Sequence, residues 1–391
     1  MKKILGSLPV RLVVALGIGI AIGFVANDAV MQVVVTLQKL LGAVVMFAIP
    51  LIIIGFIAPS ITKLGSNASR LLWIALILAY ISSIGAAFFA VASGYAIIPN
   101  LNIVSNVSGN RELPAVIFDL QIPQIMPVMS ALVFSVLIGL AAVWNKADKF
   151  IGALDEFQKM VISIVTKVII PILPFFIACT FCSLTYEGSI TKQLPVFLVV
   201  ILIVIAGHFL WLALLYLLAG AYSSKNPLRV LRHYGPAYLT AVGTMSSAAT
   251  LPVALGCARK SDALRRDMLD FGIPLFANIH LCGSVLTETF FVMTVSQTLY
   301  GTLPSPTTLA LFCLLLGIFA IGAPGVPGGT VMASLGLIVS VLGFDATGTA
   351  LMLTIFALQD SFGTACNVTG DGALTLMLTG YMEKREKRSG K

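Results

Sequence analysis

Charged residues are scarce in this chain, which has 16 acidic and 24 basic side chains among its 391 residues. Together they make up 10% of the sequence, whereas apolar residues make up 58%. A water-soluble globular protein is thereby excluded, because its surface would need far more polar side chains than this chain supplies. The composition predicts a polytopic membrane protein.

Disulfide, metal and catalytic patterns are missing as well. The six cysteines are scattered through apolar segments, and the pair Cys179 and Cys182 lacks a second pair of ligands, so we interpret it as helix packing. The sequence contains no Gly-x-Ser-x-Gly or His-Glu-x-x-His motif. Ser247 and His280 therefore do not indicate an intramembrane hydrolase, and we predict that the protein is not an enzyme.

Apolar runs long enough to span about 30 Å of hydrocarbon recur through the first part of the chain. They cover residues 8–26, 33–58, 71–98, 125–144, 160–183 and 195–221. Each predicts a membrane-spanning helix, so we expect six of them before residue 223. The first run is expected to be a retained helix and not a signal peptide, because no small-residue cleavage site and soluble domain follow it.

Lysine and arginine residues fall in alternate loops, which predicts the orientation in the membrane. One set of loops carries Lys2, Lys3, Arg11, Lys63, Arg70, Lys146, Lys149, Lys225, Arg229 and Arg232. The intervening loops hold little beyond Arg111 and Lys192. Both termini are therefore expected in the cytoplasm, with the protein in a plasma or bacterial inner membrane. A basic face beside anionic lipid accounts for the net charge of +8, so no nucleic-acid partner is predicted.

After residue 223 the apolar pieces become shorter and are interrupted by Gly, Pro and Ser. Residues 235–260 are interrupted around Ser246, and residues 308–343 around Gly328. Each segment is typical of a helix, a tight tip and a returning helix, which membrane depth tolerates only beside a protein cavity. Paired segments of this kind indicate a transport site, since helix N-termini favour a carboxylate and free carbonyls can ligate Na⁺. The alternative is that these residues only kink packed helices.

Four polar residues near the C-terminus lie three or four positions apart in an otherwise apolar segment, namely Asp360, Thr364, Asn367 and Asp371. This spacing places them on one face of a helix. A carboxylate at membrane depth costs about 2.5–3.5 kcal/mol even on the lenient insertion scale, so both aspartates should have partners or cargo. A bound cation and a polar solute are the expected cargo.

Three motifs occur in the same order in the dicarboxylate/amino acid:cation symporter family, which the chain resembles over nearly its whole length. They are the Ser246-Ser247 tip, the tip at residues 325–328 and the helix at residues 367–371. The resemblance implies an all-α polytopic membrane protein with eight transmembrane helices and two re-entrant helical hairpins. It also implies a homotrimer and an elevator mechanism, in which a transport domain moves against a scaffold.

The resemblance implies a division of the chain near residue 223. Residues 1–223 would form the first six transmembrane helices, which make up the scaffold and part of the transport domain. Residues 224–391 would form the transport core. Its parts are expected at about 235–260 for hairpin 1, 268–300 for helix 7, 308–343 for hairpin 2 and 346–382 for helix 8.

Roles for individual residues also follow from the resemblance. Asp360 would receive the substrate ammonium group, Asn367 would help to hold the substrate carboxylate, and Asp371 would ligate Na⁺. The full set implied for the substrate is Ser246, Ser247, Ser284, Val326, Gly328, Asp360, Gly363, Thr364 and Asn367. The set implied for Na⁺ is Phe276, Asn278, His280, Ala320, Ile321, Ala323, Asn367 and Asp371.

One departure from the family pattern bears on the substrate. Acidic-substrate members have an arginine where this chain has Gly363, and no cation replaces it before Asp371. An acidic side chain would be desolvated there without a partner. We therefore predict a secondary active symporter that imports a neutral amino acid coupled to Na⁺. The room at Gly363 leaves a large neutral or sulfur-containing amino acid open, and no preference for serine, threonine or alanine is predicted. A C4-dicarboxylate or acidic amino acid transporter of the same fold is the alternative, although Asp360 would repel a second acid group.

A second departure bears on the ions. The family motif Asn-Met-Asp-Gly-Thr corresponds here to His-Leu-Cys-Gly-Ser at residues 280–284, so one Na⁺ site is expected to be weakened or absent. Tyr80, Ser82 and Ser83 lie near the place where the third helix would contribute to it. The sites formed by hairpin carbonyls and by Asp371 do not need the replaced side chains and are expected to persist.

Glu288 and His280 are candidates for proton coupling. Glu288 lies in an otherwise apolar run, and a family glutamate at this position is held to bind a proton. A buried carboxylic acid and an imidazole can both exchange a proton near neutral pH. The alternative pairs Glu288 with a hydroxyl group and packs His280 as a neutral core residue. The ion stoichiometry, the amino acid itself and the choice between uptake and exchange stay open.

Overall fold

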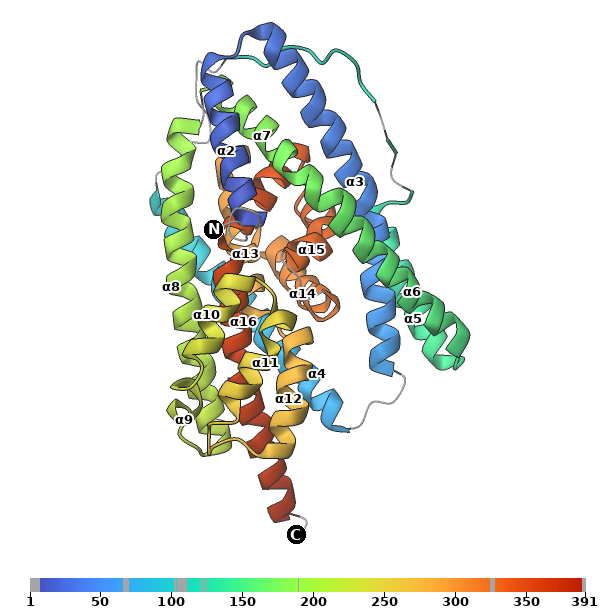
Figure 1. The fold of residues 1–391 in the computed structure, drawn as a ribbon, viewed down its shortest axis with the longest axis vertical. Coiled ribbons are helices and arrows are strands. Elements are labelled where there is room, and N and C mark those ends of the chain that lie inside the picture. The colour runs from blue at the N-terminus through green and yellow to red at the C-terminus, as the bar shows by residue number, and fades with distance from the viewer. Residues whose placement is uncertain are drawn as a thin grey trace.

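The computed structural model describes residues 8–65, 70–101, 103, 111–120, 122–123, 125–188, 190–323 and 328–388. Every regular element in these residues is a helix. The helices form an elongated bundle, and most of them run roughly along its long axis (Figure 1). The all-helical class predicted from the sequence is therefore confirmed for the described part of the chain.

The first half of the chain forms long helices, most of which coincide with the predicted runs, although no run predicted the helix over residues 148–159. They are α2 (Leu8–Val25), α3 (Asp28–Gly65), α4 (Arg70–Ile97) with the short η1 (Ile98–Leu101), α5 (Val128–Trp144), α6 (Asp148–Ile164), η2 (Val165–Ile169), α7 (Ile170–Tyr186) and α8 (Ile190–Ser223). The π-turn η2 joins α6 to α7 in one span that covers Asp148–Tyr186. Four helical spans among the described residues of this half are long and apolar enough to cross a membrane, and a fifth, Arg266–Tyr300, follows in the second half.

The second half of the chain is divided into shorter helices, followed by one long one. They are α9 (Leu228–Leu231), α10 (Gly235–Thr244), α11 (Ser247–Ala258), α12 (Arg266–Ile279), α13 (Cys282–Tyr300), α14 (Pro306–Gly322), α15 (Gly329–Ser340) and α16 (Ala346–Arg388). Interruptions occur inside both predicted hairpin segments. The division into a scaffold and a transport core stays a prediction.

The interruption between α10 and α11 is a tight turn at Met245 and Ser246. Met245 has φ 51°, a left-handed conformation that is uncommon for a residue other than glycine. Ser246 is the N-cap of α11, and its hydroxyl accepts a hydrogen bond from the N–H of Ala249 at 3.3 Å. The hydroxyls of Thr244 and Thr250 lie 3.0 Å apart and tie the two arms together. The turn therefore holds α10 and α11 against each other.

The interruption between α14 and α15 is bounded by Ala323 and Gly328. Ala323 ends α14 with extended backbone, and Gly328 precedes α15 with φ 72°, which favours glycine. The two helices pack against each other. Val326, which was predicted to contact the substrate, lies outside the described residues.

A third interruption, at His280 and Leu281, divides the helix that was predicted over residues 268–300. His280 has extended backbone at φ −114° and ψ 107°, and α13 begins at Cys282. Neither residue is a glycine or a proline, so the local sequence gives no signal for this break. The His280 side chain at this break is bonded to residues far away in the sequence, Ser82 and Asp371.

The long helix α16 runs through the interior of the second half of the chain (Figure 1). It packs against α8, α10, α12 and α13. Its buried polar side chains belong to Thr349, Thr354, Gln359, Asp360, Thr364, Asn367, Thr369, Asp371, Thr375 and Thr379. Polar groups that would be costly beside lipid are thus enclosed by protein.

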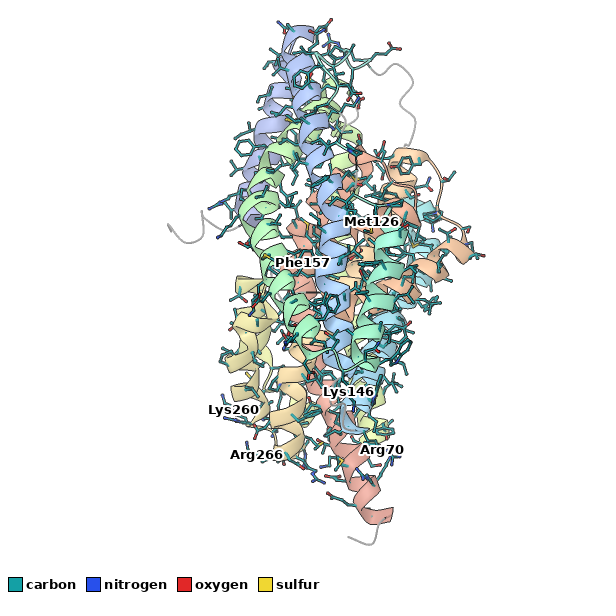
Figure 2. The ribbon with its side chains drawn as sticks, turned by 90° about the vertical axis from the view of Figure 1, so that its right-hand side faces the viewer. Arg70, Met126, Lys146, Phe157, Lys260 and Arg266 are labelled. Carbon is teal, nitrogen blue, oxygen red and sulfur yellow. The ribbon has the colours of Figure 1, made fainter. Side chains whose placement is uncertain are left out.

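Basic residues gather at the end of the bundle that holds the C-terminus. Arg70, Lys146, Lys260 and Arg266 lie toward this end in Figure 2. Two of these residues, Arg70 and Lys146, belong to loops that were predicted to share one side of the membrane, and these two loops share one end of the molecule. That this side is cytoplasmic stays a prediction.

Candidate functional site

Asp360 connects α16 to the start of α15. Its side chain is only 5% exposed, and its Oδ2 accepts a hydrogen bond from the N–H of Gly328 at 2.7 Å. Gly328 precedes the first turn of α15, where backbone N–H groups and the helix dipole favour a negative charge. The structure thus brings together two residues that the sequence predicted for the substrate. The carboxylate keeps a second oxygen that does not take part in this bond.

Asn367 connects α16 to the start of α13. Its Oδ1 accepts hydrogen bonds from the N–H groups of Gly283 at 2.7 Å and Ser284 at 3.2 Å. Its Nδ2 donates to the hydroxyl of Ser284 at 2.9 Å. Asn367 therefore satisfies first-turn donors of α13 that have no partner within the helix. Two more residues predicted for the substrate, Asn367 and Ser284, are direct neighbours.

This capping leads to a stability prediction for Asn367. We expect Asn367→Ala to lower the free energy of unfolding by about 1–3 kcal/mol, because it leaves buried N–H groups unsatisfied. The exposed Asn278 donates to the carbonyl of Pro274 on its own helix, so Asn278→Ala should change stability by less than about 0.5 kcal/mol. Thermal unfolding in detergent compares the two variants. Equal unfolding midpoints would contradict the capping role.

Gly363 packs directly against α13. A Cβ atom built on Gly363 would lie 3.4 Å from the Cα and 3.5 Å from the Oγ of Ser284, which is ordinary van der Waals contact. The first atom of a side chain therefore fits, but it points at a helix start and not into open space. The sequence predicted space beside Gly363 for a bulkier substrate, but Ser284 occupies the direction in which the Cβ atom would point. Thr364, one position further along α16, is buried.

The predicted substrate residues Ser246 and Ser247 lie at the tip between α10 and α11. Ser247 is buried, whereas the hydroxyl of Ser246 caps α11. Both α10 and α11 pack on α16, the helix that carries Asp360 and Asn367. The two serines therefore lie at the tip of a helix pair that packs on α16. Their contact with a substrate stays a prediction.

His280 bridges α4 and α16 at the break between α12 and α13. Its Nδ1 lies 3.0 Å from Oδ1 of Asp371, and its Nε2 lies 2.9 Å from the hydroxyl of Ser82. All three side chains are buried, with exposures of 0% for His280, 1% for Asp371 and 4% for Ser82. Both ring nitrogens are therefore engaged.

The remaining predicted Na⁺ ligands are mostly backbone groups. The carbonyl of Phe276 accepts the N–H of His280 at 2.9 Å, and the carbonyl of Ala320 accepts the N–H of Ala323 at 3.4 Å. Asn278 is exposed. Ile321 lies in the last turn of α14. Among the described residues, no group of three or more His, Cys, Asp or Glu side chains could hold a metal ion. The Na⁺ ligands implied by the resemblance stay a prediction.

Glu288 faces α15 from α13. Its side chain is completely buried, and its Oε1 accepts a hydrogen bond from the hydroxyl of Ser334. Its Oε2 has no hydrogen-bond partner in the described part of the structure. This contact agrees with the alternative considered from the sequence, in which Glu288 pairs with a hydroxyl group. Proton exchange at Glu288 stays a prediction.

His208 is a functional candidate that the sequence analysis missed. From α8, its Nε2 lies 3.0 Å from the carbonyl of Gly283 and 2.9 Å from the hydroxyl of Thr287. Thr287 in turn donates to Oε1 of Gln359 at 2.7 Å. The available signal was a histidine in the middle of an apolar run, since intramembrane ionisable residues often mark functional sites. Through Gly283, His208 supports the helix start that Asn367 caps.

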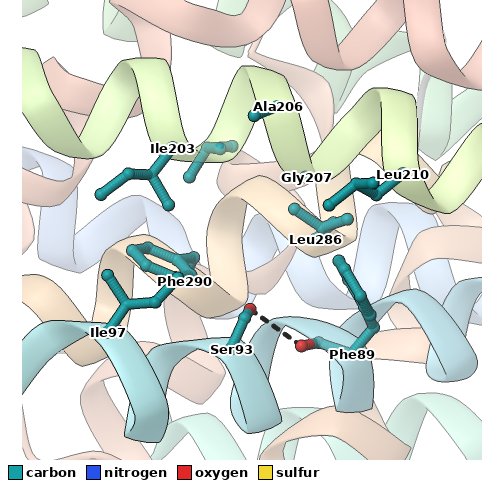
Figure 3. A pocket seen from close by; sticks show the side chains of 10 residues that line it. Phe89, Ser93, Ile97, Ile203, Ala206, Gly207, Leu210, Leu286 and Phe290 are labelled. Atoms are coloured by element: carbon teal, nitrogen blue, oxygen red, sulfur yellow. Dashed lines mark hydrogen bonds between the residues drawn. The ribbon is translucent and has the colours of Figure 1, made fainter.

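A separate pocket lies between α4, α8 and α13 (Figure 3). Its volume is about 240 Å³, and it is lined mainly by apolar side chains such as Phe89, Leu210 and Leu286. The hydroxyl of Ser93, which also lines it, donates to the carbonyl of Phe89 at 2.9 Å. This lining offers little to a polar solute, so the pocket is a poor candidate for a substrate site.

The chain matches the family model described as "Sodium:dicarboxylate symporter family" over residues 8–380. It is 25% identical to mouse excitatory amino acid transporter 2 over 284 residues, which is 71% of this chain and 48% of that protein. It is 24% identical to human neutral amino acid transporter B(0) over 270 residues, or 68% of this chain and 49% of that protein.

Mouse excitatory amino acid transporter 3 is 30% identical over 264 residues, which cover 67% of this chain and 48% of that protein. The chain thus spans about half the length of the curated relatives it matches. The family consists of transporters and not of enzymes, as the names of these relatives show. The chain belongs to the sodium:dicarboxylate symporter family and is, as predicted, a multi-pass membrane protein.

Proposed function

We propose that this protein is a secondary active symporter that imports a neutral amino acid together with Na⁺. The observation that carries the proposal is the contact between Asp360 and Gly328, which joins a buried carboxylate to the start of α15. An ammonium group needs a carboxylate partner, and a substrate carboxylate needs the N–H groups of a helix start. The contact thus places a carboxylate beside a helix start, which are the two kinds of group that an amino acid requires.

The substrate's two charged groups can be assigned to opposite sides of the contact. Asp360 receives the ammonium group through the oxygen that does not bond to Gly328. The carboxylate is received by N–H groups at the helix starts and by the Nδ2 of Asn367, which already lies against Ser284. Thr364, on the same buried face of α16, lies between these two residues in the sequence.

Gly363 favours a neutral substrate side chain. From Asp360 to Asp371 the chain has no lysine or arginine that could pair with an acidic group. A desolvated carboxylate without a partner would lose several kcal/mol of binding free energy, on the order of 2–7 kcal/mol for a polar group without a hydrogen bond. The alternative, an acidic amino acid or a C4-dicarboxylate, is favoured by the family description and by the names of the excitatory transporters.

Sodium coupling is the property for which the family is named. In this chain we assign Na⁺ to carbonyl oxygens at the end of α14, around Ala320, Ile321 and Ala323. The end of α14 supports this assignment, because the last carbonyls of a helix carry a partial negative charge, and the carbonyl of Ala320 has only the long 3.4 Å contact with the N–H of Ala323 in the described residues.

Proton coupling through Glu288 gives a further prediction. We expect Glu288→Gln to keep amino acid binding, because the amide oxygen can still accept the hydroxyl of Ser334. The variant should lose the part of transport that a pH gradient drives, because an amide cannot carry a proton. Uptake into proteoliposomes under an imposed pH gradient measures the effect. An unchanged response to the gradient would remove Glu288 from the coupling.

The architecture is part of the same proposal. The α10–α11 and α14–α15 segments act as two re-entrant hairpins beside eight transmembrane helices, and residues 224–391 form the transport core. Two observations support this architecture. The helices are interrupted at Met245 and Gly328, and α10, α11 and α15 pack on α16. The protein would work as a homotrimer with an elevator motion, in an inner membrane, with both termini in the cytoplasm.

Ligand-induced stabilisation tests the binding part of the proposal. Neutral amino acids should raise the unfolding midpoint of the purified protein in Na⁺, because a ligand that binds only the folded state stabilises it. The same amino acids in choline should have a smaller effect, and aspartate and succinate should have none. Stabilisation by succinate or aspartate alone would favour the alternative substrate.

A further inference from the structure

His280 gives Asp371 a protein partner in place of an ion. Asp371 is a buried carboxylate in a membrane protein, so it requires a partner of some kind. The structure supplies the Nδ1 of His280 at 3.0 Å. The contact joins residues 91 positions apart in the sequence, and no periodic pattern could have shown it.

The hydrogen bonds around His280 are complete without any ion. An ionised carboxylate only accepts hydrogen bonds, so Nδ1 is the donor toward Asp371. Nε2 can then act as an acceptor, and the hydroxyl of Ser82 donates to it across 2.9 Å. The imidazole of His280, in a single tautomer, therefore bonds both to the hydroxyl of Ser82 on α4 and to the carboxylate of Asp371 on α16.

The space around the ring is also filled. A Cβ atom added to Gly370 would lie 2.8 Å from Cε1 of His280 and 3.4 Å from Sγ of Cys282. The ring therefore lies close against the backbone of α16. On another side the ring of Phe276 meets it edge to face, with 6.4 Å between the ring centres. Only the absence of a side chain at Gly370 allows this fit.

The atoms next to Asp371 are poor ligands for Na⁺. Na⁺ is a hard cation that prefers oxygen, whereas the side-chain atom 3.0 Å from Oδ1 of Asp371 is a ring nitrogen of His280. An N–H that points at the carboxylate occupies the direction from which a cation would approach. The donor set fits a fixed imidazole and does not fit the ion that family resemblance implied.

We propose that the imidazole of His280 permanently takes the place of a cation at Asp371, so that Asp371 is not a Na⁺ ligand in this protein. The inference rests on the proposed Na⁺ symport and deepens it, because it removes one ion from the coupling. Na⁺ is then left to the carbonyl oxygens near the end of α14. The bridge instead holds α4 against α16 across the α12–α13 break.

Counting bound Na⁺ tests this inference directly. Equilibrium binding of ²²Na⁺ to the purified full-length protein, with a saturating neutral amino acid, gives the number of ions per protomer. We expect Asp371→Asn to bind as many ions as the unchanged protein. Loss of one ion in this variant would overturn the inference. Absence of Na⁺ binding in the unchanged protein would instead contradict the proposed function, so the two failures can be told apart.

Two adjacent serines on α4 provide a matched comparison for the bridge. Ser82 bonds to His280, whereas the hydroxyl of Ser83 has no partner in the described residues, although both side chains are buried. We expect Ser82→Ala to lower the unfolding midpoint more than Ser83→Ala does, with the Na⁺ count unchanged in both. Equal midpoints for the two variants would contradict the bridge.

A structure of the unchanged protein in saturating Na⁺ gives a test that does not depend on a variant folding. The inference expects the His280 to Asp371 contact to persist, with no ion at the carboxylate. Density for an ion bound to Asp371 would overturn it.

Discussion

Asp360→Asn is expected to reduce amino acid uptake at least about 100-fold. Removing one partner of a buried charge pair costs about 3–5 kcal/mol, and each 1.4 kcal/mol corresponds to a factor of ten in affinity. The substitution removes the charge that the ammonium group requires. The asparagine oxygen can still accept the N–H of Gly328, so the connection between α16 and α15 is retained. Uptake of radiolabelled amino acids into proteoliposomes measures the loss.

Asp270→Asn is the matched control for removing a carboxylate. Asp270 forms an exposed ion pair with Arg259 at 3.0 Å, and such surface pairs contribute at most about 1 kcal/mol. We expect its uptake to stay within about twofold of the unchanged protein. Full uptake by Asp360→Asn would contradict the assigned role of Asp360. If the Asp360→Asn variant lost uptake of every amino acid but still took up a dicarboxylate, the dicarboxylate would replace the amino acid as the proposed substrate.

Gly363→Arg is expected to create uptake of acidic amino acids and to reduce uptake of neutral ones. A hydrogen bond to a charged group contributes about 1.5–3 kcal/mol, which corresponds to roughly 10- to 150-fold in affinity for aspartate. A Cβ atom at this position contacts Ser284 without a clash, so the longer side chain can start there. Competition between labelled aspartate and a neutral amino acid measures the change.

Two control variants separate charge from size at this position. Gly363→Ala should keep the neutral preference, because its methyl group makes only ordinary contacts with Ser284. Gly363→Met adds a long side chain without a charge, so it should not create aspartate uptake. Aspartate uptake by the methionine variant, or by the unchanged protein, would contradict the assigned role of Gly363.

The helices and the chain interruptions could largely be predicted from the sequence. Apolar runs of membrane-spanning length located α2 to α5, α7 and α8, because burial in lipid requires long stretches without charge, whereas most of α6 lies before the predicted run over residues 160–183. Glycine, proline and serine located the interruptions near Met245 and Gly328, because such residues allow turns that ordinary helices exclude. The spacing of Asp360 and Asn367 placed them on one helix face, and the structure brings both to helix starts.

The contacts between distant segments could not be predicted in this way. His280 and Ser82 are 198 positions apart, and hydrophobic periodicity contains no information on such a pair. The break before α13, at His280 and Leu281, has no glycine or proline to signal it. Asn367 was expected to face the substrate, but its amide oxygen serves the N–H groups of Gly283 and Ser284.

The most direct measurement is uptake of a labelled panel of amino acids, with aspartate and succinate included, into proteoliposomes that hold the purified protein. Separate experiments impose a Na⁺ gradient and a pH gradient. We predict concentrative uptake of neutral amino acids under the Na⁺ gradient. Uptake of succinate or aspartate in their place, or no response to Na⁺, would contradict a Na⁺-coupled neutral amino acid symporter.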